Sequence, residues 1–452
     1  VFFNHLMLEK LIKYKNLKNL TLRKNIFLSG LFRFPVLIFE FLSIRLIFLY
    51  LDETNYGLLI TLYAISSWMS FIKLGFNSTL ITKIASSIEK RNKRKTKSLI
   101  STALIFVSFV SFCMMFIILI TNYFVNFADI INTPEFLKNE FDLLLVFVLI
   151  LSLIQYTAEI IKSVLIAINL AFAQNLIDFF SRGANLLVIF YLTKTFDKSL
   201  FLIGISRSLI LAIVPLLMGL IFFQFIDKDY KPGFRYFNFS VLADIWQLSW
   251  KFFLIQACST IIFSTDSIII NQFIGPSSVA KYDIASRYFR ILAIFLSLFA
   301  PFWSTFARAN AGKDYKLLKN TLKKFLISFI PVIPICLLMI IFGKIIINDF
   351  WIGKETGITF LLLSAMAILN IIQSWNRVFN YFLNGVGSIN ITLITMLIAA
   401  IINIPLSIFF AKNLNLGVLG VTLGTIVSVS IFSIFGPLKA SIILRNKNEH
   451  LT

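Results

Sequence analysis

Charged side chains inside long apolar stretches are the residues of this sequence best suited to move or bind an ion. Ionisable groups at membrane depth are costly and normally face a cavity, a charged partner or a transport path. The fifteen that we single out are ten basic and five acidic residues, so this set carries a positive excess that would suit the passage of an anion. They are Arg33, Glu40, Arg45, Lys73, Asp142, Glu159, Lys162, Asp178, Arg182, Arg207, Lys251, Asp266, Arg287, Arg290 and Arg377.

Some of these charges have a purely structural explanation. Glu159 and Lys162 are three residues apart and Asp178 and Arg182 are four apart, so each pair could neutralise itself on one helix face. For these four residues, structural pairing and a role in transport are equally good explanations. Long basic side chains near the end of a span can also extend to the membrane interface, which applies to Arg45, Lys73, Lys251 and Arg377.

Two other groups of charges are harder to explain by local pairing. Arg33 and Glu40 share a helix face but lie seven residues apart, about 10 Å along the axis, so each needs another partner. This spacing favours side chains that line a cavity. Asp283, Arg287 and Arg290 follow an i, i+4, i+7 pattern in which two cations share a face with one acid, and the surplus charge favours an anionic substrate.

Asp266 is the most isolated acid deep within a span, and two roles for it remain open. It could couple transport to an ion, or it could hold Arg290 on the following helix. Glu159 and Asp178 are further candidates for ion coupling. The predicted substrate path contains Arg33, Glu40, Arg182, Asp266, Arg287, Arg290 and Arg377.

The cysteines and histidines predict no catalytic or metal chemistry. The three cysteines stand alone within apolar runs, and the two histidines, His5 and His450, lie in the terminal segments. This spacing matches no disulfide framework and no metal cluster. We therefore predict no catalytic residue, no metal site and no cofactor. The cysteines are Cys113, Cys258 and Cys336.

The elements that hold these residues are predicted to be membrane-spanning helices. Of the 452 residues, 58% are hydrophobic and 14% charged, and the mean hydropathy is +0.87. The apolar runs are about 18 to 27 residues long, enough to cross about 30 Å of hydrocarbon, and they lack the alternation of a membrane barrel. We predict an all-α polytopic protein of about 12 transmembrane helices. The predicted spans are 25–50, 57–80, 98–121, 141–167, 174–193, 199–226, 246–273, 281–304, 325–347, 357–383, 388–411 and 416–438.

The basic residues between these spans predict the orientation of the chain. Loops and tails on one side hold 25 Lys and Arg residues against 7 on the other, where Lys281 and Lys344 at the ends of their spans are counted with the adjoining loops. This bias places both termini in the cytoplasm. The net charge of +21 is therefore explained by topology, and no nucleic acid is expected as a partner. The predicted parts are a basic interfacial segment 1–24, six-helix bundles 25–226 and 246–438, a cytoplasmic linker 227–245 and a cytoplasmic tail 439–452. In transporters built from two such halves, the substrate path lies at their interface.

Three segments give the sequence a family resemblance. They are 50–58 (YLDETNYGL), 74–85 (LGFNSTLITKIA), and 266–275 (DSIIINQFIG) followed by 279–285 (VAKYDIA). These segments resemble the Wzx-type flippases of O-antigen and related repeat units, which belong to the multidrug/oligosaccharidyl-lipid/polysaccharide exporter superfamily. The resemblance implies a fold like that of the MATE exporters.

The resemblance also implies a function. A flippase of this kind would move an undecaprenyl-pyrophosphate-linked O-antigen or capsule-like repeat unit from the cytoplasmic to the periplasmic leaflet by alternating access, which an ion gradient can drive. It would work as a monomer in the bacterial inner membrane, in contact with membrane lipids and with a polysaccharide polymerase and a chain-length regulator as further partners. A sugar chain and a pyrophosphate need a polar path, because each unpaired polar group costs several kcal/mol in hydrocarbon.

Two alternatives to the flippase remain. A multidrug exporter of the same superfamily would share the fold, but the cationic excess within the spans does not suit cationic drugs. A polysaccharide polymerase or ligase is also polytopic and basic, but such enzymes resemble proteins with one large periplasmic loop. The longest external loop here, 122–140, has about 19 residues and a single basic residue, Lys138. We therefore predict a transporter and not an enzyme.

Overall fold

The computed structural model describes residues 22–125, 127–130, 133, 135–168, 170–226, 230–297, 306, 309–310 and 314–448. The predicted interfacial segment 1–24 lies almost entirely outside these residues, as does the end of the predicted tail 439–452. The described chain forms two compact units. One contains the described residues up to Asp52 together with Ile65–Gln256, and the other contains Glu53–Ala64 and the described residues from Ala257 onward.

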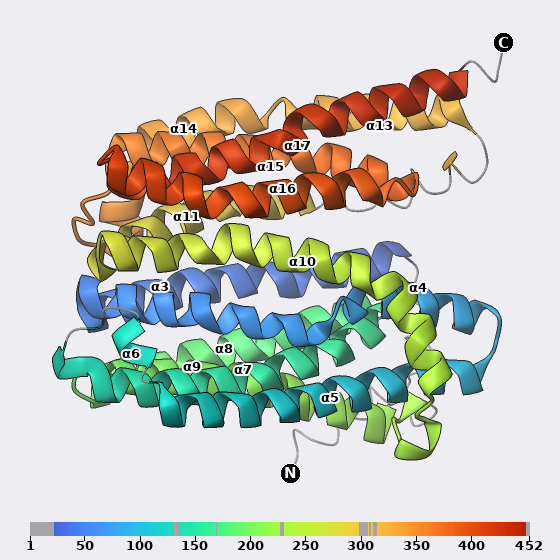
Figure 1. The fold of residues 1–452 in the computed structure, drawn as a ribbon, viewed down its shortest axis with the longest axis horizontal. Helices are drawn as coiled ribbons and strands as arrows, with labels where there is room; N and C mark the ends of the chain where they lie inside the picture. The colour runs from blue at the N-terminus through green and yellow to red at the C-terminus, as the bar shows by residue number, and fades with distance from the viewer. Residues whose placement is uncertain are drawn as a thin grey trace. The chain divides into compact units, whose positions relative to one another are not determined.

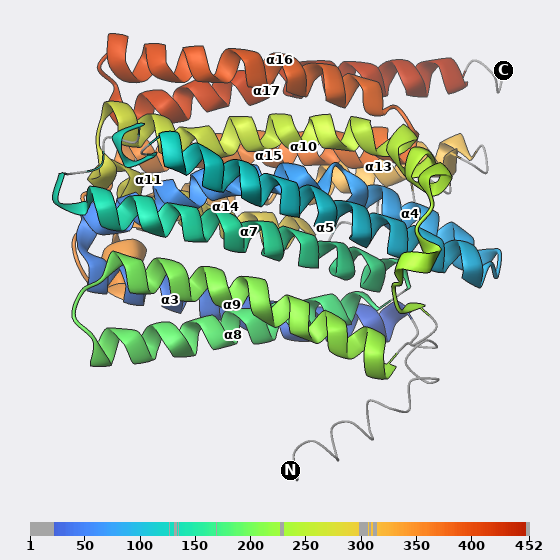
Figure 2. The same cartoon turned by 60° about the horizontal axis from the view of Figure 1, so that its bottom comes forward.

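The first unit is a bundle of long helices joined by short turns (Figures 1 and 2). Its elements are the first part of α3 (Leu22–Ser67), η1 (Trp68–Lys73), α4 (Phe76–Glu89), α5 (Lys93–Phe124), α6 (Phe127–Ile130), η2 (Glu135–Leu137), α7 (Lys138–Ala167), α8 (Ala171–Thr195), α9 (Leu200–Ile221), the π-turn η3 (Phe222–Ile226), the 3₁₀ turn η5 (Phe234–Tyr236) and the start of α10 (Phe239–Phe273).

The second unit is also helical (Figures 1 and 2). Besides Glu53–Ala64 of α3 and the remainder of α10, it contains α11 (Pro276–Ser297), α13 (Tyr315–Phe329), α14 (Val332–Ile345), the π-turn η6 (Ile346–Ile352), α15 (Phe360–Gly385), α16 (Ile389–Ile408), the π-turn η7 (Phe409–Asn413) and α17 (Gly417–Asn448).

A break inside α3 explains why its second part belongs to the other unit. Asp52 has φ 75° and ψ 173°, a region used almost only by glycine that costs about 1–3 kcal/mol. Just beyond it, the Tyr56 hydroxyl donates a 2.6 Å hydrogen bond to Asp283 of α11. Gly57 lies so close to Pro276 that a Cβ at this position would sit 1.7 Å from the proline carbonyl oxygen. The predicted boundary between two six-helix bundles at 227–245 stays a prediction. The structure adds that Glu53–Ala64 packs with the helices of the second unit.

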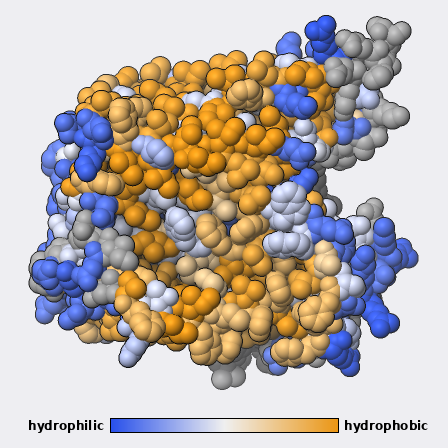
Figure 3. Space-filling view, in the orientation of Figure 1, coloured by the Kyte–Doolittle hydropathy of each residue, from blue (hydrophilic) through white to orange (hydrophobic). Residues whose placement is uncertain are grey.

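The surface of the helices matches a membrane protein. Nine segments of the described chain are long and apolar enough to span a bilayer. Hydrophobic side chains cover the middle of the face shown in Figure 3, and hydrophilic ones gather at the helix ends. Large apolar side chains such as Leu187, Ile341 and Ile401 are exposed, which is stable in lipid and costly in water. The chain is therefore a multi-pass membrane protein. Every predicted span overlaps a described helix, while the number of twelve and the cytoplasmic termini stay predictions.

Small residues bring α16 and α17 into close contact. Gly420, Gly424 and Ser428 recur every four residues along α17, a spacing that lets two membrane helices approach closely. A Cβ on Gly424 would lie 2.5 Å from Ser407 Oγ and 2.7 Å from its Cα, so the two backbones leave no room for a side chain there. This contact fixes the polar side chains that α16 and α17 carry into the second unit.

We expect Gly424→Ala to destabilise the protein by about 1–3 kcal/mol, because the added methyl group must push two backbones apart. The apparent melting temperature of the purified protein in detergent measures this effect. Gly30→Ala is the matched control, since a Cβ at Gly30 has no heavy atom within 4 Å. Equal melting temperatures for the two variants would contradict the close contact between α16 and α17.

Candidate functional site

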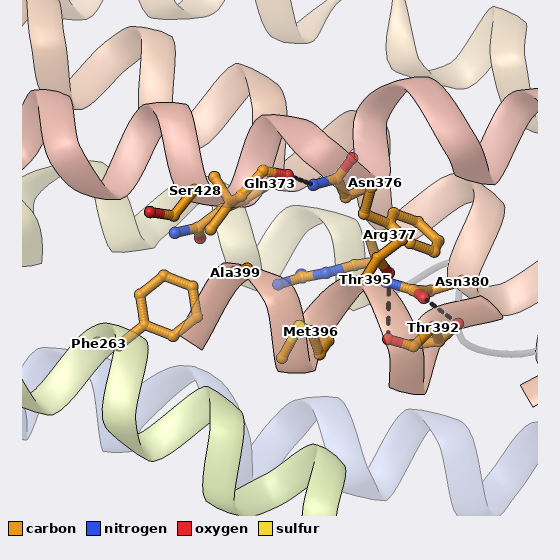
Figure 4. A pocket seen from close by; sticks show the side chains of 12 residues that line it. Phe263, Gln373, Asn376, Arg377, Asn380, Thr392, Thr395, Met396, Ala399 and Ser428 are labelled. Carbon is orange, nitrogen blue, oxygen red and sulfur yellow. Dashed lines mark hydrogen bonds between the residues drawn. The ribbon is translucent and has the colours of Figure 1, made fainter. Parts of the chain in front are cut away.

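A cavity of about 210 Å³ with both polar and apolar walls lies within the second unit (Figure 4). Three helices, α15, α16 and α17, form most of its wall, and α10 contributes one aromatic ring. The lining combines amides, hydroxyls, one guanidinium group and apolar surfaces, which is unusual in a segment predicted to cross lipid. The lining residues are Phe263, Gln373, Asn376, Arg377, Asn380, Thr392, Thr395, Met396, Ala399, Ser428, Val429 and Phe432.

Helix α15 supplies the polar wall from one of its faces. Gln373, Asn376, Arg377 and Asn380 follow an i, i+3, i+4, i+7 pattern, which places them on neighbouring turns of the same side. Asn376 Nδ2 donates to the Val429 carbonyl at 2.9 Å, which ties this wall to α17.

Two further hydrogen bonds fix the amides of α15. Ser433 Oγ donates to Asn376 Oδ1 at 2.7 Å, and Thr392 Oγ1 donates to Asn380 Oδ1 at 3.1 Å. Both amide groups are therefore held in defined orientations by the adjacent helices. A wall with fixed donors and acceptors can select a polar ligand by its geometry.

Arg377 is the charged member of this cavity. Its side chain is half-buried and extends in Figure 4 toward Met396 and Ala399 of α16. A guanidinium group presents five donors in a plane, a geometry that suits phosphate oxygens and sugar hydroxyls. The sequence analysis selected Arg377 but missed Gln373, Asn376 and Asn380. Their spacing on one face of an apolar helix was the signal that could have found them.

Asp266 occupies a second polar cluster in the same unit. Its carboxylate is fully buried and accepts hydrogen bonds from the Tyr282 hydroxyl at 2.6 Å and from Thr425 Oγ1 at 2.9 Å. Within the described residues it forms no ion pair, so the suggestion that Asp266 holds Arg290 is wrong for this structure. Tyr282 and Thr425 neutralise the carboxylate in part by their hydroxyl dipoles, but they supply no counter-charge.

Asn403 extends the Asp266 cluster into α16. Its Nδ2 donates to Thr425 Oγ1 at 3.1 Å, while its Oδ1 is buried and accepts no hydrogen bond from the described residues. A buried acceptor without a donor costs about 1–3 kcal/mol. Among the described residues, the cluster thus contains a buried carboxylate without a counter-ion and the unsatisfied amide oxygen of Asn403.

The cavity and the Asp266 cluster share three helices. On α10, α16 and α17, a residue of the cavity and a residue of the cluster are three or four positions apart, about one helical turn or 5 Å along each axis. The pairs are Phe263 and Asp266, Ala399 and Asn403, and Ser428 and Thr425. A shift of these helix segments at one site therefore also moves residues of the other site.

The structure pairs two members of the predicted stripe on α11 with each other. Arg287 Nε lies 2.6 Å from Asp283 Oδ2, and the Tyr56 hydroxyl donates to the same oxygen at 2.6 Å. Arg290 is exposed on the same helix. The sequence predicted two cations against one acid, and the structure pairs one of these cations, Arg287, with Asp283.

The acids of the first unit pair with bases on other helices. Glu159 of α7 accepts from Lys73 of η1 at 2.8 Å, and Lys162 of α7 donates to Asp178 of α8 at 2.5 Å. The proposed local pairs Glu159–Lys162 and Asp178–Arg182 are therefore wrong. A base three or four positions away on the same helix competes with bases on neighbouring helices. For Glu159 and Asp178, the bases on neighbouring helices form the ion pairs.

The remaining charges of the first unit divide into paired and exposed groups. Glu40 of α3 pairs with Arg182 of α8 at 3.2 Å, which confirms that Glu40 needed a partner other than Arg33. Arg33 is exposed, and the described chain offers it no ion pair. Lys73 is buried against Glu159 and lies over the Tyr156 ring at 4.7 Å, so its expected extension to the interface is wrong.

The predicted site residues therefore fall into two groups. Arg33, Glu40, Glu159, Asp178 and Arg182 belong to the first unit, and Asp266, Arg287, Arg290 and Arg377 belong to the second. The path predicted between the two halves stays a prediction. Among the described residues, no group of three or more His, Cys, Asp and Glu side chains could hold a metal ion.

Comparison with protein families identifies the chain. A family model described as polysaccharide biosynthesis protein matches residues 22–302, more than half of the sequence. The chain belongs to this polysaccharide biosynthesis protein family. A second model, MatE, matches residues 252–409. These matches confirm the resemblance to flippases of the exporter superfamily that three sequence segments indicated.

Two curated proteins are similar in sequence. An uncharacterized membrane protein of Methanocaldococcus jannaschii is 23% identical over 392 residues, which cover 82% of this chain and 75% of the relative. A putative O-antigen transporter of Salmonella typhimurium is 24% identical over 200 residues, 43% of this chain and 46% of the relative. The second match thus spans less than half of each protein.

Solved transporters share the fold. An inward-facing multidrug resistance MATE family transporter of the MOP superfamily has a TM-score of 0.74 at 16% identity, over 90% of this chain and 94% of its own. A MOP superfamily transporter from Pyrococcus furiosus has a TM-score of 0.68 at 14% identity, over 94% and 96%. The predicted MATE-like fold is therefore confirmed, and at these identities the likeness concerns the fold alone.

We expect the ion pair between Lys162 and Asp178 to behave as a coupled unit. Lys162→Met or Asp178→Leu alone leaves a half-buried charge without its partner and should cost about 2 kcal/mol. The double variant should recover most of this loss, because both charges are removed together. Melting temperatures of the three purified variants measure the effect.

Lys138→Met serves as the control for this cycle. Lys138 pairs with Asp129 and Glu135, which are largely exposed, so its loss should change stability by less than about 1 kcal/mol. A double variant that is no more stable than either single variant would show that Lys162 and Asp178 do not depend on each other.

Proposed function

We propose that this protein is a flippase for a lipid-linked oligosaccharide, which it moves from the cytoplasmic to the periplasmic leaflet of a bacterial inner membrane by alternating access. The observation that carries the proposal is the set of polar side chains on the wall of the cavity in the second unit. Amides, hydroxyls and the Arg377 guanidinium replace the water that sugar hydroxyls and phosphate oxygens lose on leaving the cytoplasm.

The lining of the cavity favours a glycan over a cationic drug. Phe263 and Phe432 offer apolar ring faces on which a sugar ring can pack, while Gln373 and Asn380 offer both donors and acceptors. The cavity contains no carboxylate among its lining residues to attract a cation. With about 210 Å³ it is smaller than the roughly 300–1,000 Å³ of sites that enclose drug-sized ligands, so it contacts one part of the substrate at a time.

The family and the relatives support the same substrate class. The chain belongs to a family described as polysaccharide biosynthesis protein, and one curated relative is a putative O-antigen transporter. In the proposed function, the substrate is an undecaprenyl-pyrophosphate-linked repeat unit of O-antigen or capsule type. The protein acts as a monomer, and a polymerase and a chain-length regulator act on the product.

We propose further that a cation bound at Asp266 drives the transport cycle. A buried carboxylate without a counter-ion is stabilised when it binds a proton or a monovalent cation. Asn403 Oδ1 is an unsatisfied oxygen ligand of the kind that hard cations prefer. Because the cluster lies one helical turn from the cavity on three helices, binding at Asp266 can change the packing of the cavity wall.

Arg377→Gln should reduce glycan export at least about tenfold, since a charge-assisted contact to a substrate phosphate or hydroxyl contributes more than 1.4 kcal/mol. Complementation of a flippase-deficient strain, followed by immunoblotting of surface polysaccharide, measures the effect. Lys344→Gln is the matched control, because Lys344 is an exposed cation of α14 that does not line the cavity. Full export by Arg377→Gln, with drug efflux lost instead, would favour the multidrug exporter.

Asp266→Asn should remove the response of the protein to the coupling cation. In the wild-type protein, we expect the melting temperature in detergent to rise in NaCl relative to KCl if sodium binds, or to depend on pH alone if a proton binds. Asp266→Asn should abolish either response. Tyr282→Phe keeps the carboxylate and should retain a weaker response. A wild-type protein that shows neither response would overturn cation binding at Asp266.

A further inference from the structure

A long apolar groove runs along α5 in the first unit. Its larger hollow, about 490 Å³, is lined by α5 and by the segment 232–234 that precedes η5 and begins it. A second hollow of about 230 Å³ shares Ser108 and Phe112 with the first and continues to Met115. From Leu104 to Met115 the groove follows α5 for about 16 Å, close to half of the roughly 30 Å hydrocarbon layer.

Hydrogen bonds from and to hydroxyl groups hold the segment before α10 against α5, so this wall of the groove has a defined position. Ser98 Oγ donates to the Tyr236 carbonyl at 2.9 Å, and the Gly233 amide donates to Ser101 Oγ at 3.1 Å. These bonds hold Phe234 at the edge of the groove, where 84% of its surface is exposed. In Figure 1 the segment precedes α10 at the end of α5 that the basic residues assign to the cytoplasm.

Two cations lie at the cytoplasmic end of this groove. Lys97 is seven residues before Leu104, on the same face of α5, and its Nζ lies 4.6 Å from the centre of the Tyr236 ring. Arg235 packs over the same ring at 4.7 Å and donates to the Tyr236 hydroxyl at 2.5 Å. No carboxylate of the described chain pairs with either cation. The hydrogen bond from Arg235, and then the positive charges of Arg235 and Lys97, lower the pKa of the Tyr236 hydroxyl below its usual value.

We propose that this groove binds the lipid end of the transported substrate, with the diphosphate at Lys97 and Arg235 and the polyprenyl chain along α5. The inference rests on the proposed function and adds an entry site for its substrate. Two cations without an acid match a headgroup that carries at least two negative charges, whereas an ordinary anionic phospholipid carries one. The phenylalanines Phe109, Phe112 and Phe234 give a branched chain an apolar surface about one leaflet deep.

Binding of undecaprenyl diphosphate to the purified full-length protein tests this site. Native mass spectrometry or microscale thermophoresis in detergent can titrate the lipid, with phosphatidylglycerol as the competing anionic lipid. The double variant Lys97→Gln and Arg235→Gln should bind undecaprenyl diphosphate at least about tenfold more weakly than the wild type, a loss of 1.4 kcal/mol or more. Filling the groove with Ser108→Phe should weaken binding independently of charge.

The double variant Arg94→Gln and Lys95→Gln is the matched control. It removes two exposed cations from the preceding turn of α5 and should leave binding unchanged. Unchanged binding in both the cation variant and Ser108→Phe, with each variant eluting as folded protein, would overturn the groove. Equal affinity of the wild type for phosphatidylglycerol would also overturn it, because the site would then bind ordinary membrane lipid.

The outcome also separates this inference from the proposed function. If the groove variants bind the lipid and export glycan as well as the wild type does, only the assignment of the lipid site to this groove is wrong. If the wild type neither binds undecaprenyl diphosphate nor restores surface polysaccharide, the proposed function itself fails.

Discussion

Hydrocarbon does not solvate charge, and this constraint explains most of the polar structure of the protein. In the first unit, Glu40, Glu159 and Asp178 each pair with a base on another helix, so that each ion pair also joins two helices. In the second unit, Asp283 neutralises Arg287 one turn further along the same helix, α11. Asp266 differs from these acids, because hydroxyl groups surround it and no base pairs with it in the described chain. This difference makes it the strongest candidate for an exchangeable cation.

Close packing of α16 against α17 places the two polar sites of the second unit next to each other. Gly424 has no room for a side chain, and Thr425 beside it points at Asp266 while Ser428 lines the cavity one turn away. The small residues therefore position both polar sites as well as packing the two helices. If a cation at Asp266 alters the contact between these helices, the wall of the cavity changes with it, which gives a physical route from ion binding to substrate binding.

The fold alone does not decide the substrate. A multidrug resistance transporter shares it at 16% identity and another MOP superfamily transporter at 14%, and fold similarity at that level says little about what is carried. The assignment to a glycan rests on the chemistry of one cavity and on the polysaccharide biosynthesis family. The groove along α5 extends this reasoning to the lipid part of the substrate, since a flippase substrate has an apolar end as well as a polar one.

The sequence by itself determined the membrane helices and the family, because the length and hydropathy of a span are local properties that survive any packing. It also identified Arg377, Asp266 and the need of Glu40 for a distant partner. Only the tertiary structure decided which charges meet, since Lys73 and Lys162 find acids 86 and 16 residues away rather than on their own helix turn. The uncharged members of the cavity, such as Asn376 and Thr392, likewise become a site only when three helices bring them together. The apolar residues of a helix show that it is buried in lipid or protein. Which helices pack against it depends on the fit of side chains and the pairing of polar groups across the whole unit.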